Sequence, residues 1–317
     1  MKRASGLTLV EMMTAMLLVL AVSAGTLAFV ARGRAAHRTS EAIARLEETT
    51  DAALALLVDE LRMAGYLGLA APGSPVAGAS SLGTAELPEL AAAGGCGLSL
   101  AHDLGTTVSA ADGAFGVTNS SPLRCSAGPQ GRVVAGSDTL TLRHASAAAT
   151  EADPGRLQLE TSSRAARLMA DGAPRLGASG RIHDLEVSVF YVSADSTAQR
   201  GWPSLRRKRL IGGGGPAFQD EELVTGIEDL QVEIGLDAAV DQDTAVDRWV
   251  APTEVFGADA PRAIRLWVRA RSDLPEHPDV VQPALSYANR DEPRASLRYR
   301  RKLSSRIVEL RNLQGAP

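Results

Sequence analysis

The feature that most constrains this chain is an uncharged apolar run close to its N-terminus. From Met12 to Ala31 the sequence holds twenty residues without a single Asp, Glu, Lys or Arg. As an α-helix that rises about 1.5 Å per residue, this run is about 30 Å long, which matches the hydrocarbon core of a bilayer. Lys2 and Arg3 precede the run and favour a cytoplasmic position for that end. The run therefore predicts one membrane-spanning helix, with the rest of the chain on the far side of the membrane.

The remainder of the chain is long enough to build a folded domain. The sequence has 317 residues, of which 45% are hydrophobic, and a net charge of −4 at pH 7. Such a chain lacks the strong basic excess of a dedicated nucleic-acid-binding protein, and two cysteines are too few for a cysteine-rich zinc module. Aromatic residues make up 4% of the sequence, so bases or sugars would find few stacking platforms. Composition therefore predicts no specific nucleic-acid partner.

Three interpretations compete for the N-terminal segment. A cleavable secretory signal would place a small-residue site after the apolar run, and the stretch Ala21–Ala24 offers one. A plain signal anchor needs only the apolar run. Neither interpretation explains Glu11, because a carboxylate in a membrane helix costs about 2.5–3.5 kcal/mol unless it has a partner. Glu11 is therefore a candidate functional residue.

The residues that lead into the apolar run are more specific. The sequence Gly-Leu-Thr-Leu-Val-Glu at 6–11 resembles the class III signal of type IV pilins and type II secretion pseudopilins. The resemblance implies that residues 1–6 are a leader peptide and that a prepilin peptidase cleaves between Gly6 and Leu7. It also implies that the new amine of Leu7 is then methylated. The first mature residue is usually Phe in this family, so Leu7 is a departure from the common pattern.

The resemblance also implies a role for Glu11 and the nearby Thr8 in assembly. In a filament of such subunits, Glu11 would lie near the amine of a neighbour's first residue. Pairing two charges in a medium of low dielectric constant removes the penalty that either would suffer alone. Because a slipped subunit would leave a buried charge unmatched, this pair would set the axial register of the filament.

The apolar run is predicted to continue into a much longer helix. No proline occurs before Pro72, so the sequence predicts one helix over 7–64, with a membrane and filament-core part at 7–31 and an amphipathic part at 32–64. Gly65 follows as a plausible residue to end it. The apolar positions of the second part are Ile43, Leu46, Leu54, Leu57, Val58 and Leu61, and its polar positions include Glu41, Arg45, Glu47, Glu48, Asp51, Asp59 and Glu60.

The first part of the predicted head, at 65–135, is rich in Gly, Ala, Ser and Pro and is expected to be irregular, with one short helix at 87–93. Cys96 and Cys125 both lie in it. Because the compartment beyond the membrane is oxidising, we expect a disulfide between them. Closing a loop of about 30 residues would contribute about 3–4 kcal/mol. A catalytic thiol is the alternative, but neither cysteine has a nearby partner in the sequence to activate it.

The second part of the predicted head, at 136–317, is expected to be rich in β-strands. Apolar and polar residues alternate there, which indicates an antiparallel sheet with one covered face. The amphipathic half of the long helix is the natural cover. The predicted fold is therefore α+β and pilin-like, with a long N-terminal helix packed on an antiparallel β-sheet head. The predicted strands are 139–143, 156–160, 185–192, 205–211, 230–234, 264–269 and 296–310.

Short motifs in the head resemble one branch of the family, the PilW minor pilins. They are LRMAGY at 61–66, LVTGIEDLQV at 223–232, AIRLWVRARS at 263–272 and VELRNL at 308–313. The resemblance implies a minor pilin that helps to prime the type IV pilus, lies at or near its tip and supports adhesion and twitching motility. A minor pseudopilin of a type II secretion system, similar to GspJ, is the alternative within the superfamily. A membrane-anchored periplasmic enzyme is the alternative of another class.

Partners and location follow from the same resemblance. It implies a single-pass protein of the inner membrane with a periplasmic head, which later becomes part of an extracellular pilus. The implied partners are the prepilin peptidase, other minor pilins, the major pilin, the inner-membrane pilus assembly machinery, membrane lipid before assembly, and a tip adhesin.

The sequence offers little for catalysis or metal binding. It contains no G-x-S-x-G, H-E-x-x-H, P-loop or G-x-G-x-x-G motif, so we expect no enzyme activity and no cofactor. Asp241, Asp243 and Asp247 form a weak calcium candidate, because hard cations bind several carboxylate oxygens on a tight loop. Ala245 and Val246 interrupt the calcium-like pattern of PilW relatives, and a solvated acidic loop is the simpler interpretation.

Two basic runs lie at 206–209 and between 298 and 306. We interpret them as a charged outer sheet face, which protects edge strands from aggregation. Sequence-independent attraction to DNA phosphates is the alternative.

Overall fold

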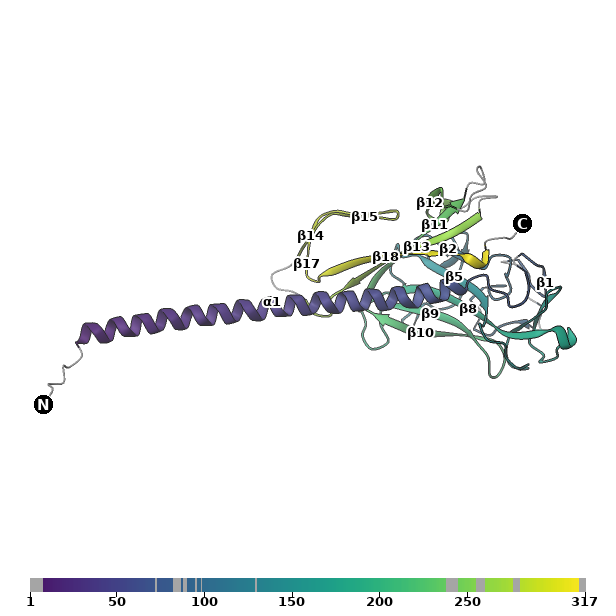
Figure 1. Ribbon diagram of the computed structural model, residues 1–317, viewed down its shortest axis with the longest axis horizontal. Coiled ribbons are helices and arrows are strands. Elements are labelled where there is room, and N and C mark those ends of the chain that lie inside the picture. The colour runs from purple at the N-terminus through teal and green to yellow at the C-terminus, as the bar shows by residue number, and fades with distance from the viewer. Residues whose placement is uncertain are drawn as a thin grey trace. The chain divides into compact units, whose positions relative to one another are not determined.

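The computed structural model describes residues 8–71, 73–81, 87, 90–94, 96–97, 99–128, 130–237, 245–254, 260–275 and 280–313. It divides into two compact units, Met1–Arg45 and Leu46–Pro317. In its described residues the first unit is helical. The second unit, the head, contains the last part of the same helix together with the strands (Figure 1).

Helix α1 runs from Leu9 to Met63, so the predicted long helix is present over its described residues. It ends where Gly65 adopts a φ of +79°, a left-handed conformation that favours glycine. The N–H of Gly65 donates to the carbonyl of Arg143 at 3.1 Å, which ties the end of the helix to a strand. Of the predicted apolar positions, Ile43 is 39% exposed, whereas Leu46, Leu54, Leu57 and Leu61 are buried.

The larger sheet has eight strands and is built around β8. Its main order is β1-β7-β6-β8-β5-β2, and β9 pairs with β8 and with β10. All pairs are antiparallel except β1 with β7. The strands are β1 (Val76–Ala77), β2 (Val108–Ala111), β5 (Thr139–Ala145), β6 (Gln158–Thr161), β7 (Ala166–Met169), β8 (Arg181–Ser193), β9 (Ser204–Ile211) and β10 (Ala217–Thr225).

The smaller sheet has four antiparallel strands in the order β12-β11-β13-β18. They are β11 (Ile227–Asp237), β12 (Arg248–Val250), β13 (Ala260–Arg271) and β18 (Arg301–Glu309). The predicted strand at 296–310 is divided into two pieces, β17 (Ala295–Leu297) and β18. Two-stranded pairs complete the head: β3 (Gly116–Thr118) with β4 (Ser121–Pro122), β14 (Val280–Gln282) with β17 (Ala295–Leu297), and β15 (Leu285–Tyr287) with β16 (Arg290–Glu292).

The main core lies where the end of α1 meets both sheets. Leu54 and Leu57 of the helix share one buried cluster with Phe190 of the larger sheet and with Val232 and Leu266 of the smaller sheet. Burying each of these side chains contributes about 1.5–3 kcal/mol. From Leu46 onward, the amphipathic part of the helix is thus the cover that the sequence predicts, and the α+β fold with a long N-terminal helix packed on antiparallel sheets is confirmed.

The larger sheet is covered on both faces, so the prediction of one covered face is wrong for it. All seven residues of β5 are buried. Leu140 and Leu142 join the core under α1. On the opposite face, the fully buried Arg143 donates from Nε to the carbonyl of Leu100 at 2.7 Å and from Nη1 to the carbonyl of Thr106 at 2.6 Å. The irregular region that the sequence predicts therefore folds over this second face.

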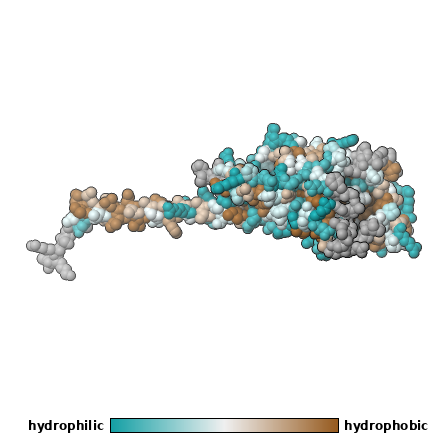
Figure 2. All heavy atoms as spheres, turned by 90° about the horizontal axis from the view of Figure 1, so that it is seen from above, coloured by the Kyte–Doolittle hydropathy of each residue, from teal (hydrophilic) through white to brown (hydrophobic). Residues whose placement is uncertain are grey.

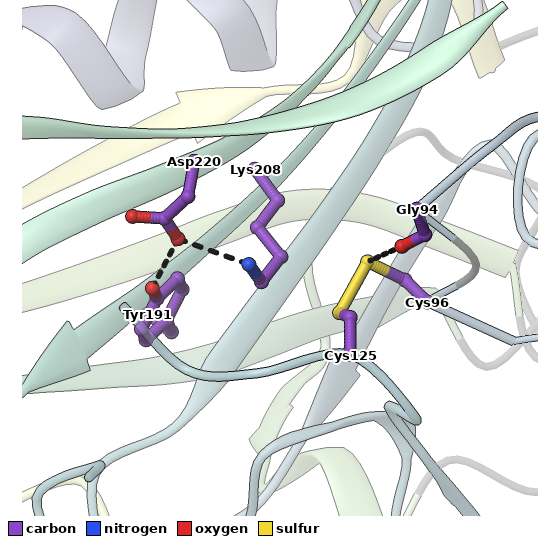
Figure 3. The surroundings of a disulfide bond; sticks show 6 residues. All are labelled: Gly94, Cys96, Cys125, Tyr191, Lys208 and Asp220. Carbon is purple, nitrogen blue, oxygen red and sulfur yellow. Dashed lines mark hydrogen bonds and ion pairs between the residues drawn. A yellow bond between two sulfur atoms is a disulfide. The ribbon is translucent and has the colours of Figure 1, made fainter. Parts of the chain in front are cut away.

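The disulfide expected between Cys96 and Cys125 is present and fastens this region. The two Cα atoms are 4.4 Å apart. Cys96 packs in a small buried cluster with Leu100 and with Val189 of β8. Figure 3 shows the disulfide beside Tyr191 and Lys208, which both bond to Asp220.

Of the short helix predicted at 87–93, the described residues show only a 3-10 turn that ends at Leu90, and residues 91–93 are not helical. The N–H of Leu90 closes a turn on the carbonyl of Leu87 at 2.9 Å. Ala93 forms a parallel bridge with Ala217 of β10, and its carbonyl accepts the N–H of Phe218 at 2.9 Å. Because Ala93 pairs its backbone with the start of an edge strand, it cannot also take part in a helix.

Candidate functional site

The N-terminal part of α1 exposes apolar side chains on all sides. Leu9, Leu17, Leu20, Leu27 and Phe29 are each more than 60% exposed. By length and composition the helix can cross a membrane, and none of its most apolar 18-residue window is buried within the chain. Figure 2 shows this apolar surface in brown. Since so much apolar surface is stable only in lipid or against other protein, we expect this segment to lie in a membrane or to pack against other protein helices.

Thr8 and Glu11 form a reciprocal cap at the start of this helix. The backbone N–H and the hydroxyl of Thr8 both donate to Oε2 of Glu11 at 2.9 Å. The N–H of Glu11 donates back to the hydroxyl oxygen of Thr8 at 3.3 Å. This is a capping box, which satisfies backbone donors that have no partner inside the helix.

The capping box changes the cost of a carboxylate in an apolar segment. One carboxylate oxygen of Glu11 is already hydrogen-bonded within its own chain, so less of its solvation is lost when the helix enters lipid. The charge itself is not neutralised, because Thr8 supplies dipoles and no positive charge. A positive partner would therefore stabilise it further. The predicted processing residues Gly6 and Leu7 lie outside the described residues.

A second cluster joins α1 to the larger sheet through Glu60. Its Oε1 pairs with Nη1 of Arg207 at 2.7 Å, and its Oε2 accepts bonds from Ser188 at 3.2 Å and from Nε2 of His144 at 3.4 Å. Arg207 also pairs with Glu221 at 2.5 Å. Glu60 is a polar position in the predicted amphipathic pattern, but it lies against the sheet because three strands offer it partners. This cluster fixes the end of the helix on the head.

The protonation of this cluster follows from its burial and its charges. Burial by itself raises the pKa of Glu60, but the hydrogen bond and charge of His144, together with the charge of Arg207, hold that pKa below its usual value of 4.5. Burial works against a charged His144, but the hydrogen bonds to Glu60 and to a backbone carbonyl raise the pKa of His144 above 6.5. Both pKa shifts favour the ion pair between Glu60 and His144.

The Glu60–His144 pair should therefore stabilise the head most in a mildly acidic window. The contribution of Glu60 is present above pH 4.5 and is lost as pH falls through its lowered pKa. The contribution of His144 is present below pH 6.5 and is lost as pH rises through its raised pKa. We expect the thermal unfolding midpoint of the full chain in detergent to fall by a few degrees on either side of this window. His144→Gln should flatten the alkaline side, whereas Ser188→Ala should flatten the acidic side and spare the alkaline one, because the Ser188 hydroxyl helps to lower the pKa of Glu60.

The acidic stretch before β12 gives no support to a calcium site. Asp241 and Asp243 lie outside the described residues. Asp247 is described, and its backbone N–H donates to the carbonyl of Leu236 at 3.0 Å. The nearby carboxylate of Asp237 is buried and bonded to Arg262 at 2.7 Å. In the part of the chain that the structure describes, no three His, Cys, Asp or Glu residues gather as a metal site would require.

The basic run at 206–209 is not a charged outer face, so that prediction is wrong. Arg206 and Lys208 are only 3% and 6% exposed, and both pair with Asp220, at 2.6 Å and 3.0 Å. Arg207 pairs with Glu60, and Arg209 pairs with Glu186 at 3.2 Å. The next strand, β10, supplies most of the acidic partners. This run is therefore neutralised and does not offer a surface for DNA.

The second basic run is also engaged by acidic partners, although it is more exposed. Lys302 and Arg306 of β18 pair with Glu47 and Asp51 of α1, at 3.3 Å and 3.4 Å. Arg301 pairs with Glu228 at 2.5 Å. Part of this run therefore bonds the edge strand β18 to the helix.

Comparison with known proteins agrees with the motifs of the head. Residues 189–312 match the family model described as PilW, Type IV Pilus-assembly protein W. A type IV-like pilin from Thermus thermophilus aligns with 12% identity and a TM-score of 0.39, over 85% of this chain and 97% of that chain. No curated protein matches the sequence. The family match confirms the resemblance to PilW that the motifs at 223–232 and 263–272 predict, whereas the motif at 61–66 lies outside the matched residues.

Proposed function

We propose that this protein, whose residues 189–312 match the PilW family, is a minor pilin of a type IV pilus. In this role it acts by assembly rather than by catalysis. One observation carries the proposal: an exposed apolar helix, capped by Thr8 and Glu11, is continuous with a head of the PilW type. An anchor alone would explain the apolar helix but not the carboxylate at its start.

The apolar part of α1 is proposed to move from the membrane into the filament core during assembly. Before assembly, the apolar part of α1 lies in the inner membrane and the head lies in the periplasm. After the leader is removed, the same helix joins the core of the filament, where other helices replace lipid around it. Glu11 keeps its bonds to Thr8 and also pairs with the N-terminal amine of a neighbouring subunit. The corresponding amine of this chain is that of Leu7. The apolar surface drives the packing, and the charge pair sets the register.

The proposed partners follow from this cycle. They are the prepilin peptidase, the inner-membrane assembly machinery, other minor pilins and the major pilin. The family match supports the type IV pilus over a type II secretion system, because its description is that of a pilus-assembly protein. We place the subunit at or near the tip, where it helps to prime the pilus and to present an adhesin for surface attachment and twitching motility.

The mass of the intact protein tests this proposal. We expect protein extracted from membranes to lack residues 1–6 and to carry one additional methyl group on Leu7. In cells without the prepilin peptidase, the full mass should remain. Cleavage near Ala24 would release a soluble protein and contradict the proposal. An uncut chain in cells that have the peptidase would leave only a signal anchor and would also contradict it.

A further inference from the structure

The end of α1 borders a cavity of about 420 Å³ in the head. All of its described lining residues belong to the unit Leu46–Pro317, so the cavity lies within one compact unit. They come from the residues just after α1, from the irregular region and from the turn at Arg311–Leu313. We call this space the helix-end cavity. Its volume falls within the range of about 300–1,000 Å³ that is typical of small-molecule sites.

Asp103 lines the helix-end cavity as a buried carboxylate with few partners. Only 6% of the residue is exposed. Its Oδ1 accepts the N–H of Thr106 at 3.3 Å, and its Oδ2 has no hydrogen-bond donor in the part of the chain that the structure describes. The charge of Arg143 attracts Asp103, but that guanidinium is fully buried and does not line the cavity. Because burying a charge without a close partner is costly, a cation in the cavity would stabilise Asp103.

The other polar groups of the helix-end cavity also accept hydrogen bonds. Asn312 donates from Nδ2 to the carbonyls of Arg62 and Ala64, at 3.0 Å and 3.2 Å, so its remaining amide atom is the acceptor Oδ1. The buried hydroxyl oxygen of Ser80 has no hydrogen-bond partner among the described residues. The last carbonyls of α1 add the negative end of the helix dipole, which favours a cation. None of the described lining residues is Lys, Arg or His.

These groups select the chemistry of a ligand. An anion would be repelled by Asp103, and an apolar molecule would leave the carboxylate unpaired. Ca²⁺ and Mg²⁺ need several oxygen ligands, whereas Asp103 is the only carboxylate among the described lining residues. Apolar side chains form much of the remaining wall, including Leu67, Leu104 and Leu313. A positive group that donates several hydrogen bonds, carried on a short apolar chain, fits both kinds of surface.

We propose that the helix-end cavity binds a primary ammonium or guanidinium group at the end of a short alkyl chain. The cation pairs with Asp103, and the alkyl chain lies against the leucine side chains. Such a ligand contacts the irregular region, the end of α1 and the turn at 311–313 together, so it stabilises the folded head. The inference does not depend on the proposed function, because it rests only on residues of the head.

Three five-carbon compounds test the charge of the ligand. Isothermal titration calorimetry of the full chain in a neutral detergent at neutral pH compares cadaverine, 1,5-pentanediol and glutarate, which are positive, uncharged and negative. We expect cadaverine to bind about tenfold or more tightly than 1,5-pentanediol, and glutarate not to bind. Titration into detergent alone corrects for uptake by micelles. Equal affinity for cadaverine and 1,5-pentanediol, or no binding of cadaverine, would overturn the inference.

Substitution of Asp103 shows whether the ligand uses this carboxylate. Asp103→Asn keeps an oxygen for the N–H of Thr106 but removes the charge, and it should weaken cadaverine binding by about tenfold or more. The matched control is Glu151→Gln, because Glu151 is exposed and lies outside the cavity. Ala79→Phe is a second variant, which narrows the exposed rim of the cavity without a change in charge and should also weaken binding. Wild-type affinity for cadaverine in either folded variant would contradict the site.

Nα-acetyl-lysine methylamide distinguishes the two sources of such a group. This compound presents the ammonium as a lysine does within a protein, whereas cadaverine presents it as a free small molecule. Tighter binding of the blocked lysine would identify a lysine side chain of a protein as the ligand. Binding of cadaverine at least as tightly would identify a free amine. Both outcomes support the ammonium site, and binding of neither compound would overturn it.

Discussion

Replacement of Glu11 by glutamine is expected to reduce incorporation of this subunit into pili by about 100-fold. Glutamine has nearly the same size, and its carbonyl oxygen can still accept the bonds that Thr8 donates at 2.9 Å. Only the negative charge is lost. A neighbour's amine would then enter an apolar core without a partner, at a cost of about 2.5–3.5 kcal/mol, which corresponds to that factor. The measurement is the amount of this subunit in sheared pili relative to the amount in membranes.

Two controls make this result specific to the position of Glu11. Glu48→Gln removes an exposed carboxylate from a later turn of the same helix and should leave incorporation unchanged. The mass of the Glu11→Gln protein should still show loss of residues 1–6, which separates assembly from processing. Wild-type incorporation of the Glu11→Gln protein would show that the charge does not set register, and the assembly role assigned to Glu11 would then be abandoned.

The sequence predicts well those elements whose residues carry a strong periodic pattern. The long helix follows from an uninterrupted apolar run and from Gly65, and the alternating strands at 139–143, 185–192 and 264–269 are all found. Strand β10 has no such alternation. Its residues 219–222 read Gln-Asp-Glu-Glu, and they become a strand because the arginines and lysine of β9 pair with them across the hairpin.

The charged residues that are buried although the sequence pattern places them at the surface share one physical cause. A sequence pattern treats a charged residue as exposed, whereas an ion pair or several carbonyls can satisfy it in the interior. Arg143 is fully buried because the irregular region supplies carbonyl oxygens, and that region shows no periodic signal of its own. Glu60 is drawn to the sheet by His144 and Arg207, which lie far from it in the sequence.

The disulfide is expected to give the largest change in the stability of the head. Replacing both Cys96 and Cys125 with serine should lower the free energy of unfolding by about 3–4 kcal/mol, because the unfolded chain regains the freedom of the open loop. The sequence separation of the two cysteines is 29 residues. Denaturant unfolding of the full chain in detergent measures the change.

Loss of the disulfide should first loosen the irregular region and only later unfold the whole head, because the loop segment held by the disulfide covers one face of the larger sheet. Once it is released, the carbonyls of Leu100 and Thr106 would no longer be held against Arg143, and water would reach that face. Proteolysis of the double-serine protein should therefore begin in the irregular region, while α1 and the smaller sheet remain protected. Wild-type protein treated with a reductant should behave in the same way. A loss of stability below about 1 kcal/mol would mean that packing against β8, rather than the covalent link, holds this region in place.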